Sequence, residues 1–155
     1  KIFTRAEHPS GTTTLIPAWA DQWRLGMHYE VPAAPLAAIL QWDEIKTARL
    51  IKIDVEGAEW HVVSGMASLL RACRTDLEII IEVAPKMLEA EGRTCQEFLD
   101  FFAALGFHPY RIENDYSAAA YFAPRTPTRP QRIEQIPTET DQTDLIFSRI
   151  DAASL

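Results

Sequence analysis

The sequence has few of the residues that mark several large protein classes. It contains 2 cysteines, Cys73 and Cys95, which form no CxxC motif and are too few for a disulfide framework. Thiols used this sparingly are typical of a reducing compartment, so we expect a cytoplasmic protein. No stretch approaches the roughly 18 apolar residues of a membrane helix, and the first residues lack the apolar stretch of a signal peptide. We therefore expect no association with a membrane.

Basic residues are also in the minority. The 15 Lys and Arg against 22 Asp and Glu give a formal net charge of -7. The basic residues are scattered except for a cluster from Arg125 to Arg132, which lies in a proline-rich segment and is more typical of a solvated loop than of a phosphate site. This distribution does not predict a nucleic-acid partner.

Glycine-based motifs are missing as well. The 6 glycines never form GxG, which excludes the usual dinucleotide fingerprint and the P-loop. The HExxH zinc motif and the GxSxG nucleophile elbow are absent too. The sequence also lacks an initiator Met and starts as if within a domain, so we expect it to be a piece of a longer protein.

The clearest secondary structure lies in the middle of the chain. The β-branched runs Leu50–Val55 and Leu77–Val83 predict two strands, and the second suits a strand that is covered on both faces. Apolar residues at helical spacing from Ala58 onward predict a helix between them, with a break or close packing at Gly65. Two strands around one helix predict a β-α-β unit with parallel strands.

The flanking segments give weaker signals. We expect a helix that begins with the Thr94–Glu97 capping box and ends at Gly106, and a helical turn after Pro35. Further strands are predicted by four short apolar or β-branched runs: 12–16, 28–31, 107–112 and 143–150. The proline-rich stretch before the last strand is predicted to be a loop. We see no internal repeat and no domain boundary.

Acidic residues gather where the two central strands end. Asp54, Glu56 and Glu59 follow the first strand, and Glu82 lies at the end of the second. Because open α/β sheets bind ligands outside the carboxyl ends of their strands, we expect Asp54 and Glu82 to share one rim. Grouped carboxylates raise one another's pKa toward that of a working base, or they bind a cation such as Mg²⁺.

Structural roles are the alternative to a catalytic or cation-binding role for these residues. A carboxylate at the start of a helix commonly caps it, which is an even alternative for Glu56 and Glu59 and a weaker one for Asp54. A metal site made of Asp54, Glu59 and His61 is disfavoured, because residues two apart on a helix do not share a face. We predict no metal site. Trp60 either stacks on a ligand or, more commonly for such a residue, packs on the sheet.

The block Leu50–Glu59, followed by Val62, Val63, Gly65 and Leu70 and by Ile79–Glu82, resembles the FkbM family of S-adenosylmethionine-dependent methyltransferases. The resemblance covers about four fifths of the chain. It implies an α/β, Rossmann-like class I methyltransferase sheet, mostly parallel with an antiparallel last strand. In that sheet the block supplies the fourth strand and its helix, and Glu82 closes the fifth strand. The strands at 107–112 and 143–150 would be the sixth and seventh.

The resemblance also implies a division of the chain. Residues 1–155 would be a partial methyltransferase domain, with a lead-in segment at 1–48 and the C-terminal half of the sheet at 49–150. The family's first strand with its Gly-rich loop, and the acidic end of its second strand, have no counterpart here. We therefore expect this chain to bind the cofactor weakly or not at all. We also expect it to self-associate through the exposed sheet edge at 50–55, unless residues 1–40 partly cover that edge.

The function implied is methyl transfer from S-adenosylmethionine to a hydroxyl oxygen of a small molecule or sugar. The resemblance makes Asp54, Glu56 and Glu82 the candidate catalytic residues, with Asp54 as the first candidate for the base and Asp54 and Glu56 as candidate cofactor-binding residues. The alternative is a catalytically empty α/β remnant that binds a ligand or a protein.

Overall fold

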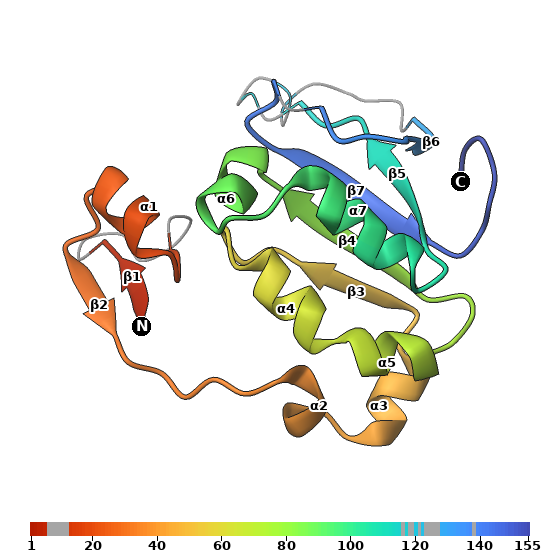
Figure 1. Cartoon of the computed structure of the whole chain (residues 1–155), viewed down its shortest axis with the longest axis horizontal. Helices are drawn as coiled ribbons and strands as arrows, with labels where there is room; N and C mark the ends of the chain where they lie inside the picture. The colour runs from red at the N-terminus through yellow and green to blue at the C-terminus, as the bar shows by residue number, and fades with distance from the viewer. Residues whose placement is uncertain (6–12, 116, 118–119, 121, 123–127, 138) are drawn as a thin grey trace.

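The centre of the structure is the β-α-β unit predicted from the sequence (Figure 1). Strands β3 (Leu50–Ile53) and β4 (Glu78–Val83) are parallel neighbours in which Ile53 lies beside Ile81. The connecting helix is divided into α4 (Glu59–Gly65) and α5 (Ala67–Ala72), so the break expected at Gly65 is confirmed. The structure is a computed structural model, and it describes residues 1–5, 13–115, 117, 120, 122, 128–137 and 139–155.

A five-stranded sheet extends this unit in the order β3-β4-β7-β5-β6. Strand β7 (Thr143–Ser148) lies between β4 and β5 (His108–Ile112) and is antiparallel to both, which confirms the expected antiparallel last strand. Among the described strands, β3, β4 and β5 run in the same direction and β7 and β6 run against them, so the sheet is mixed and β3–β4 is its one directly paired parallel couple. Insertion of β7 replaces one would-be parallel contact, between β4 and β5, with two antiparallel contacts.

The proline-rich stretch is not a loop throughout. It contains the two-residue strand β6 (Gln131–Arg132), which pairs antiparallel with β5. The Arg132 guanidinium lies 2.6 Å from the Asp151 carboxylate, and the Ser154 backbone forms a bridge with Gln131. These contacts with the chain end stabilise a strand that is too short for a sequence signal. Arg125, Pro124 and Pro127 lie outside the described residues.

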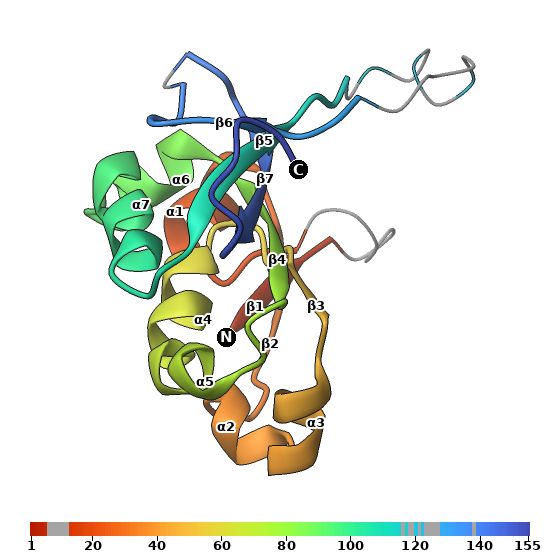
Figure 2. The same cartoon turned by 90° about the vertical axis from the view of Figure 1, so that its right-hand side faces the viewer.

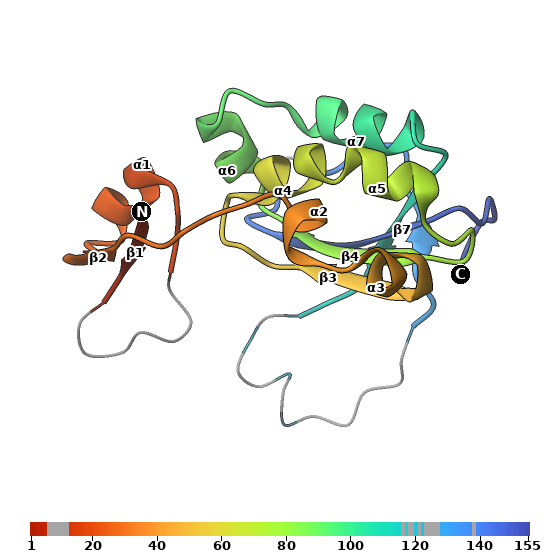
Figure 3. The ribbon, with the colours of Figure 1, turned by 90° about the horizontal axis from the view of Figure 1, so that it is seen from below.

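The four helices that follow β3 all lie on one face of the sheet (Figures 2 and 3). They are α4, α5, α6 (Pro85–Ala90) and α7 (Cys95–Ala103). Helix α7 begins with the predicted capping box, in which the Glu97 backbone N–H donates to the Thr94 hydroxyl at 3.1 Å. Its Phe102 ring stacks on Phe147 of β7 at 3.8 Å between ring centroids, which joins the helix to the centre of the sheet.

The helix-covered face explains the burial pattern of β4. Ile79, Ile81 and Val83 are fully buried under the helices, whereas the alternate residues, including Glu82, are half-buried on the opposite face. The expectation that this strand is fully covered on both faces is therefore wrong. The half-covered face is the one that carries the acidic side chains.

The described residues up to Tyr29 form a first layer beside the carboxyl end of β3, whereas residues 36–47 lie toward its amino end (Figure 1). Strand β1 (Ile2–Thr4) pairs with β2 (Met27–Tyr29), which is a shorter strand than the predicted 28–31. The strand expected at 12–16 is reduced, among its described residues, to one bridge between Thr14 and Phe3. The described part of this N-terminal segment also contains three short helices: α1 (Pro17–Gln22), α2 (Leu36–Ile39) and α3 (Trp42–Thr47). Of these, α2 was predicted from Pro35, whereas α1 and α3 were not predicted.

Candidate active site at the carboxyl ends of β3 and β4

Three carboxylates form a row across the ends of neighbouring strands. The parallel register that places Ile53 beside Ile81 brings Asp54 level with Glu82, so the predicted shared rim is confirmed. Antiparallel pairing then places Asp144 of β7 directly opposite Glu82. We call these three carboxylates, together with that of Glu56 in the turn after β3, the acidic rim.

Glu82 of the acidic rim has a pKa close to neutral pH. Burial raises the pKa of Glu82 to about 7, and the charges of Asp54, Asp144 and Glu56 add to the rise, while Lys52 opposes it. Burial also raises the pKa of Glu56, with smaller contributions from the other acids nearby. Such a shift is what a general base working near pH 7 requires, although grouped structural carboxylates show it too.

Lys52 supplies the positive charge beside the rim. Its Nζ lies 2.8 Å from the Asp54 carboxylate on the same face of β3, where residues two apart point the same way. The hydrogen bond and charge of Asp54 raise the pKa of Lys52. Asp54 is thereby held in an ion pair. The strongest charges that act on Glu82, by contrast, are those of other acidic residues.

The turn between β3 and α4 holds Glu56 in an uncommon conformation. Glu56 has φ 51° and Gly57 has φ 99°, so two successive residues are left-handed. Glycine adopts this region freely, and glutamate does so only when its surroundings hold it there. The Thr14 hydroxyl donates to the Glu56 carbonyl at 2.8 Å and supplies part of that support.

Glu59 supports the same turn from the other side. Its carboxylate is buried, with 4% of the residue exposed, and accepts backbone N–H groups from Val55 at 3.3 Å and Gly57 at 3.2 Å. Burial raises the pKa of Glu59, and these donors oppose the rise. Glu59 therefore fixes the turn that leads into α4 rather than capping the helix, whose N-cap Ala58 makes no side-chain cap hydrogen bond.

The metal site considered from the sequence does not form. His61 Nε2 instead lies 2.7 Å from the Glu91 carboxylate. Among the residues that the structure describes, no group of three His, Cys, Asp or Glu could hold a metal ion. Trp60 packs edge-on against Phe101 of α7 at 5.8 Å, which favours its structural role.

Two clefts meet at Asp54. One, of about 350 Å³, is lined by Asp54, Val55, Glu56 and residues of the first layer, namely Ile2 and 13–15. The other, of about 290 Å³, follows the free edge of β3 and includes Ile51, Ile53 and Met66. The carboxyl end of β3 is therefore accessible to a ligand from two directions.

Sequence reasoning missed three residues of this site. Asp144 was seen only as part of a strand, since its place opposite Glu82 depends on the long-range insertion of β7. Thr14 acts across 42 residues, which no local pattern reveals. Lys52 had a usable signal, because a lysine two positions before Asp54 in a strand lies on the same face.

Comparison with known proteins identifies the region that carries the rim. Residues 8–109 match the family model described as the Methyltransferase FkbM domain. The chain belongs to the FkbM methyltransferase family. This FkbM match includes Asp54, Glu56 and Glu82 and ends before Asp144. No curated protein and no solved structure matches the chain.

Membership of the FkbM family makes this a methyltransferase domain that acts on a small molecule. The mixed sheet with helices on one face is an α/β fold. In the part of the chain that the structure describes, no helix is long and apolar enough to cross a membrane.

Proposed function

We propose that the chain takes part in S-adenosylmethionine-dependent methyl transfer to a hydroxyl oxygen of a small molecule or sugar. The observation that carries the proposal is the acidic rim, where Glu82 has a pKa of about 7 at the end of a strand in an FkbM domain. An oxygen nucleophile must lose its proton as the methyl group arrives, and a carboxylate poised near neutral pH suits that task.

The donor set at Asp54 and Glu56 fits the positively charged end of the cofactor. S-adenosylmethionine carries a sulfonium and an ammonium group, and carboxylates on a cleft wall complement both charges. The cleft of about 350 Å³ is at the small end of the range for ligand pockets, about 300 to 1,000 Å³. When bound, the cofactor would supply an activated methyl group.

Glu82 is the preferred base over Asp54. Asp54 is engaged by Lys52 at 2.8 Å and is better suited to orienting a hydroxyl or holding positive charge. Glu82 faces the other rim acids and would accept the hydroxyl proton in its ionised form. Glu56, whose position is held by Thr14, would assist Asp54.

We infer that residues 49–150 are the C-terminal half of a Rossmann-like methyltransferase sheet and that residues 1–48 lead into it. Support comes from the antiparallel β7 inserted between β4 and β5 and from the free edge of β3 among the described strands. Two free cysteines support a cytoplasmic location.

The experiment is methyl transfer from radiolabelled S-adenosylmethionine, at millimolar concentration, to a panel of sugars and small alcohols. Asp54→Asn should lower the rate about 10²-fold, the order expected for loss of a group that acts on the reacting proton or orients its donor. Its unfolding free energy should change by less than about 0.5 kcal/mol, since exposed ion pairs contribute little. Asp43→Asn, on the exposed α3, is the control. An unchanged rate in Asp54→Asn would remove Asp54 from the chemistry.

A further inference from the structure

The first layer contacts the turn of the acidic rim through the Thr14 hydroxyl. This hydroxyl donates to the Glu56 carbonyl at 2.8 Å and accepts the Ile16 backbone N–H at 3.1 Å. Thr14 is 1% exposed, so both hydrogen bonds are shielded from water. Its backbone is fixed as well, because Thr14 and Phe3 exchange N–H···O bonds of 2.9 and 3.1 Å. One side chain therefore links β1 of the layer to the turn after β3.

Ile16 packs beside the same turn. It is 6% exposed, and its Cγ1 lies 3.3 Å from the position that a Cβ on Gly57 would occupy. Met87 Sδ of α6 lies 3.1 Å from that position on Gly57. The hydrogen bond to Glu56 and the packing at Gly57 thus hold two successive residues that both have a positive φ. A left-handed glutamate depends on such surroundings, whereas glycine does not.

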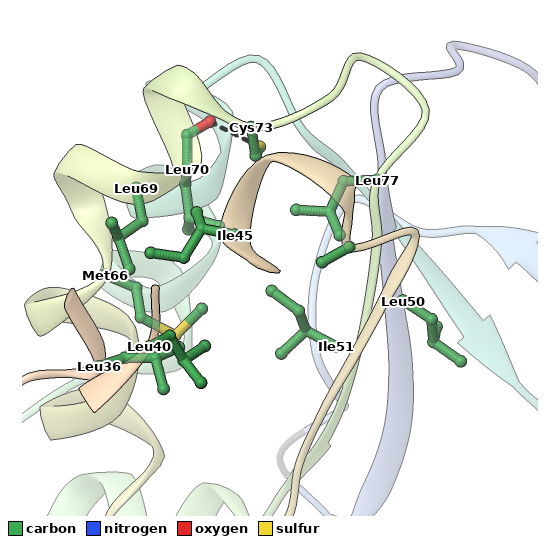
Figure 4. Close-up of a pocket in the computed structure, with 11 residues that line it drawn as sticks. Leu36, Leu40, Ile45, Leu50, Ile51, Met66, Leu69, Leu70, Cys73 and Leu77 are labelled. Atoms are coloured by element: carbon green, nitrogen blue, oxygen red, sulfur yellow. Dashed lines mark hydrogen bonds between the residues drawn. The ribbon is translucent and has the colours of Figure 1, made fainter. Parts of the chain in front are cut away.

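An extended strap joins the first layer to the rest of the chain. Its residues, 30–35, form no helix or strand, and all of them are exposed. The segment after the strap is anchored at the amino end of β3, where Leu36 and Ile45 line an apolar pocket (Figure 4). Because an exposed strap imposes little restraint, the position of the layer on the rim depends on the contacts of Thr14 and Ile16.

We propose that Thr14 is a positioning residue through which the first layer sets the geometry of the acidic rim. With the layer docked, Thr14 holds Glu56 left-handed and close enough for its charge to act on Glu82. Without the Thr14 hydroxyl, Glu56 relaxes to an ordinary backbone conformation, which redirects its side chain and reshapes the cleft that both residues line. The effect on methyl transfer rests on the proposed function, whereas the effect on the turn rests on these contacts alone.

The test compares variants of the full chain by NMR. A left-handed residue brings its own amide and Hα protons unusually close, so Glu56 in wild type should give a strong intraresidue NOE. Thr14→Val keeps the shape of the side chain without the hydroxyl, and this NOE should fall to that of an ordinary turn residue. Thr14→Ser keeps the donor and should retain the NOE. Thr47→Val, which removes a hydroxyl that donates to the Asp43 carbonyl of α3 at 2.7 Å, is the matched control and should retain it too.

A wild-type chain without the strong NOE at Glu56, or a folded Thr14→Val chain that keeps it, would overturn the inference. If Thr14→Val loses its circular dichroism spectrum, Thr14→Cys replaces it, because a thiol is a weak donor of similar size and should also weaken the NOE. A second arm measures methyl transfer by wild type. The expected NOE pattern in a chain that transfers no methyl group supports the role of Thr14 and counts against the proposed function, so the two proposals fail separately.

Discussion

Glu82 makes stability depend on pH. Its pKa is about 7 in the folded chain, above the value of about 4.3 for an unfolded glutamate. The unfolded state therefore loses this proton first, so the folded state loses stability as pH rises from about 4.3 to about 7. Because Glu82 is only half-buried, solvent screens its charge, and the loss of stability is smaller than the full pKa shift would give.

Glu82→Gln, which stays uncharged, should therefore raise the melting temperature at pH 8 by about 2 to 4 °C, the shift for roughly 1 kcal/mol in a domain of this size. Near pH 4 the variant and wild type should melt together. Glu78→Gln, on the same face of β4, is the matched control and should show no such pH-dependent gain. A gain that is equal at both pH values would contradict the assignment.

Glu59 has a structural role that one substitution isolates. Glu59→Ala leaves the Val55 and Gly57 N–H groups without their buried acceptor, which should cost about 2 to 4 kcal/mol in urea unfolding. Glu59→Gln keeps one acceptor oxygen and should lose less. Glu89→Ala, at an exposed position of α6, should change stability by less than about 0.5 kcal/mol. A Glu59→Ala chain as stable as wild type would show that water replaces the carboxylate.

At the scale of elements, two glycines of the β3-α4 region should respond in opposite directions to alanine. Gly57 has φ 99°, and a Cβ there would lie 3.1 Å from Met87 Sδ and 3.3 Å from Ile16 Cγ1. Gly65 lies at the end of α4 with nothing within 4 Å of such a Cβ.

Gly57→Ala should therefore destabilise the chain by about 1 to 3 kcal/mol through a strained backbone and tight contacts. Gly65→Ala should stabilise it by about 0.5 to 1 kcal/mol, since alanine favours the helix. Chemical denaturation of both variants measures the difference. Destabilisation by Gly65→Ala would mean that the break between α4 and α5 needs glycine.

Elements with a strong local period were predictable. The strands β3 and β4 and the helix between them follow from β-branched runs and helical spacing, and α7 follows from its capping box. The two-residue β6 carries no period that could reveal it, because its pairing with β5 and the chain end is long-range. The site residues differ in the same way. Asp54 and Glu82 were predictable because they close strands with a clear local pattern, whereas Asp144 was not, because it joins them only through the long-range position of β7.

At the scale of the whole molecule, the free edge of β3 governs association. Among the described strands β3 pairs only with β4, and Leu50 on it is 57% exposed. Leu36 from the first 40 residues packs against the core, but among the described strands none of this segment pairs with the free edge of β3. Self-association stays a prediction, because unpaired strand edges are templates for pairing.

Sedimentation velocity should show a concentration-dependent dimer for wild type and a monomer for Leu50→Glu. Ile150→Glu is the matched control, because Ile150 has the same 57% exposure away from this edge, and it should dimerise like wild type. A wild-type chain that remains monomeric at high concentration would contradict this prediction.

Cofactor affinity should be weak in this chain. No described loop supplies the glycine-rich turn that the resemblance assigns to the cofactor, so we expect a dissociation constant of about 1 mM or weaker, near −4 kcal/mol. Calorimetry measures it directly. Micromolar affinity in a monomer would mean that the rim and the first layer form a complete cofactor site.

In the mechanism that we propose, Glu82 of the acidic rim accepts the proton during methyl transfer. Its most direct test is the pH dependence of the rate between pH 5.5 and 9, at saturating acceptor and millimolar S-adenosylmethionine, in wild type, Glu82→Gln and Glu78→Gln. Wild type and Glu78→Gln should gain activity as pH rises through about 7, the pKa of Glu82. Glu82→Gln should be at least about 10²-fold slower and should lose that inflection. A Glu82→Gln variant with the wild-type rate and the wild-type pH profile would exclude Glu82 as the proton acceptor.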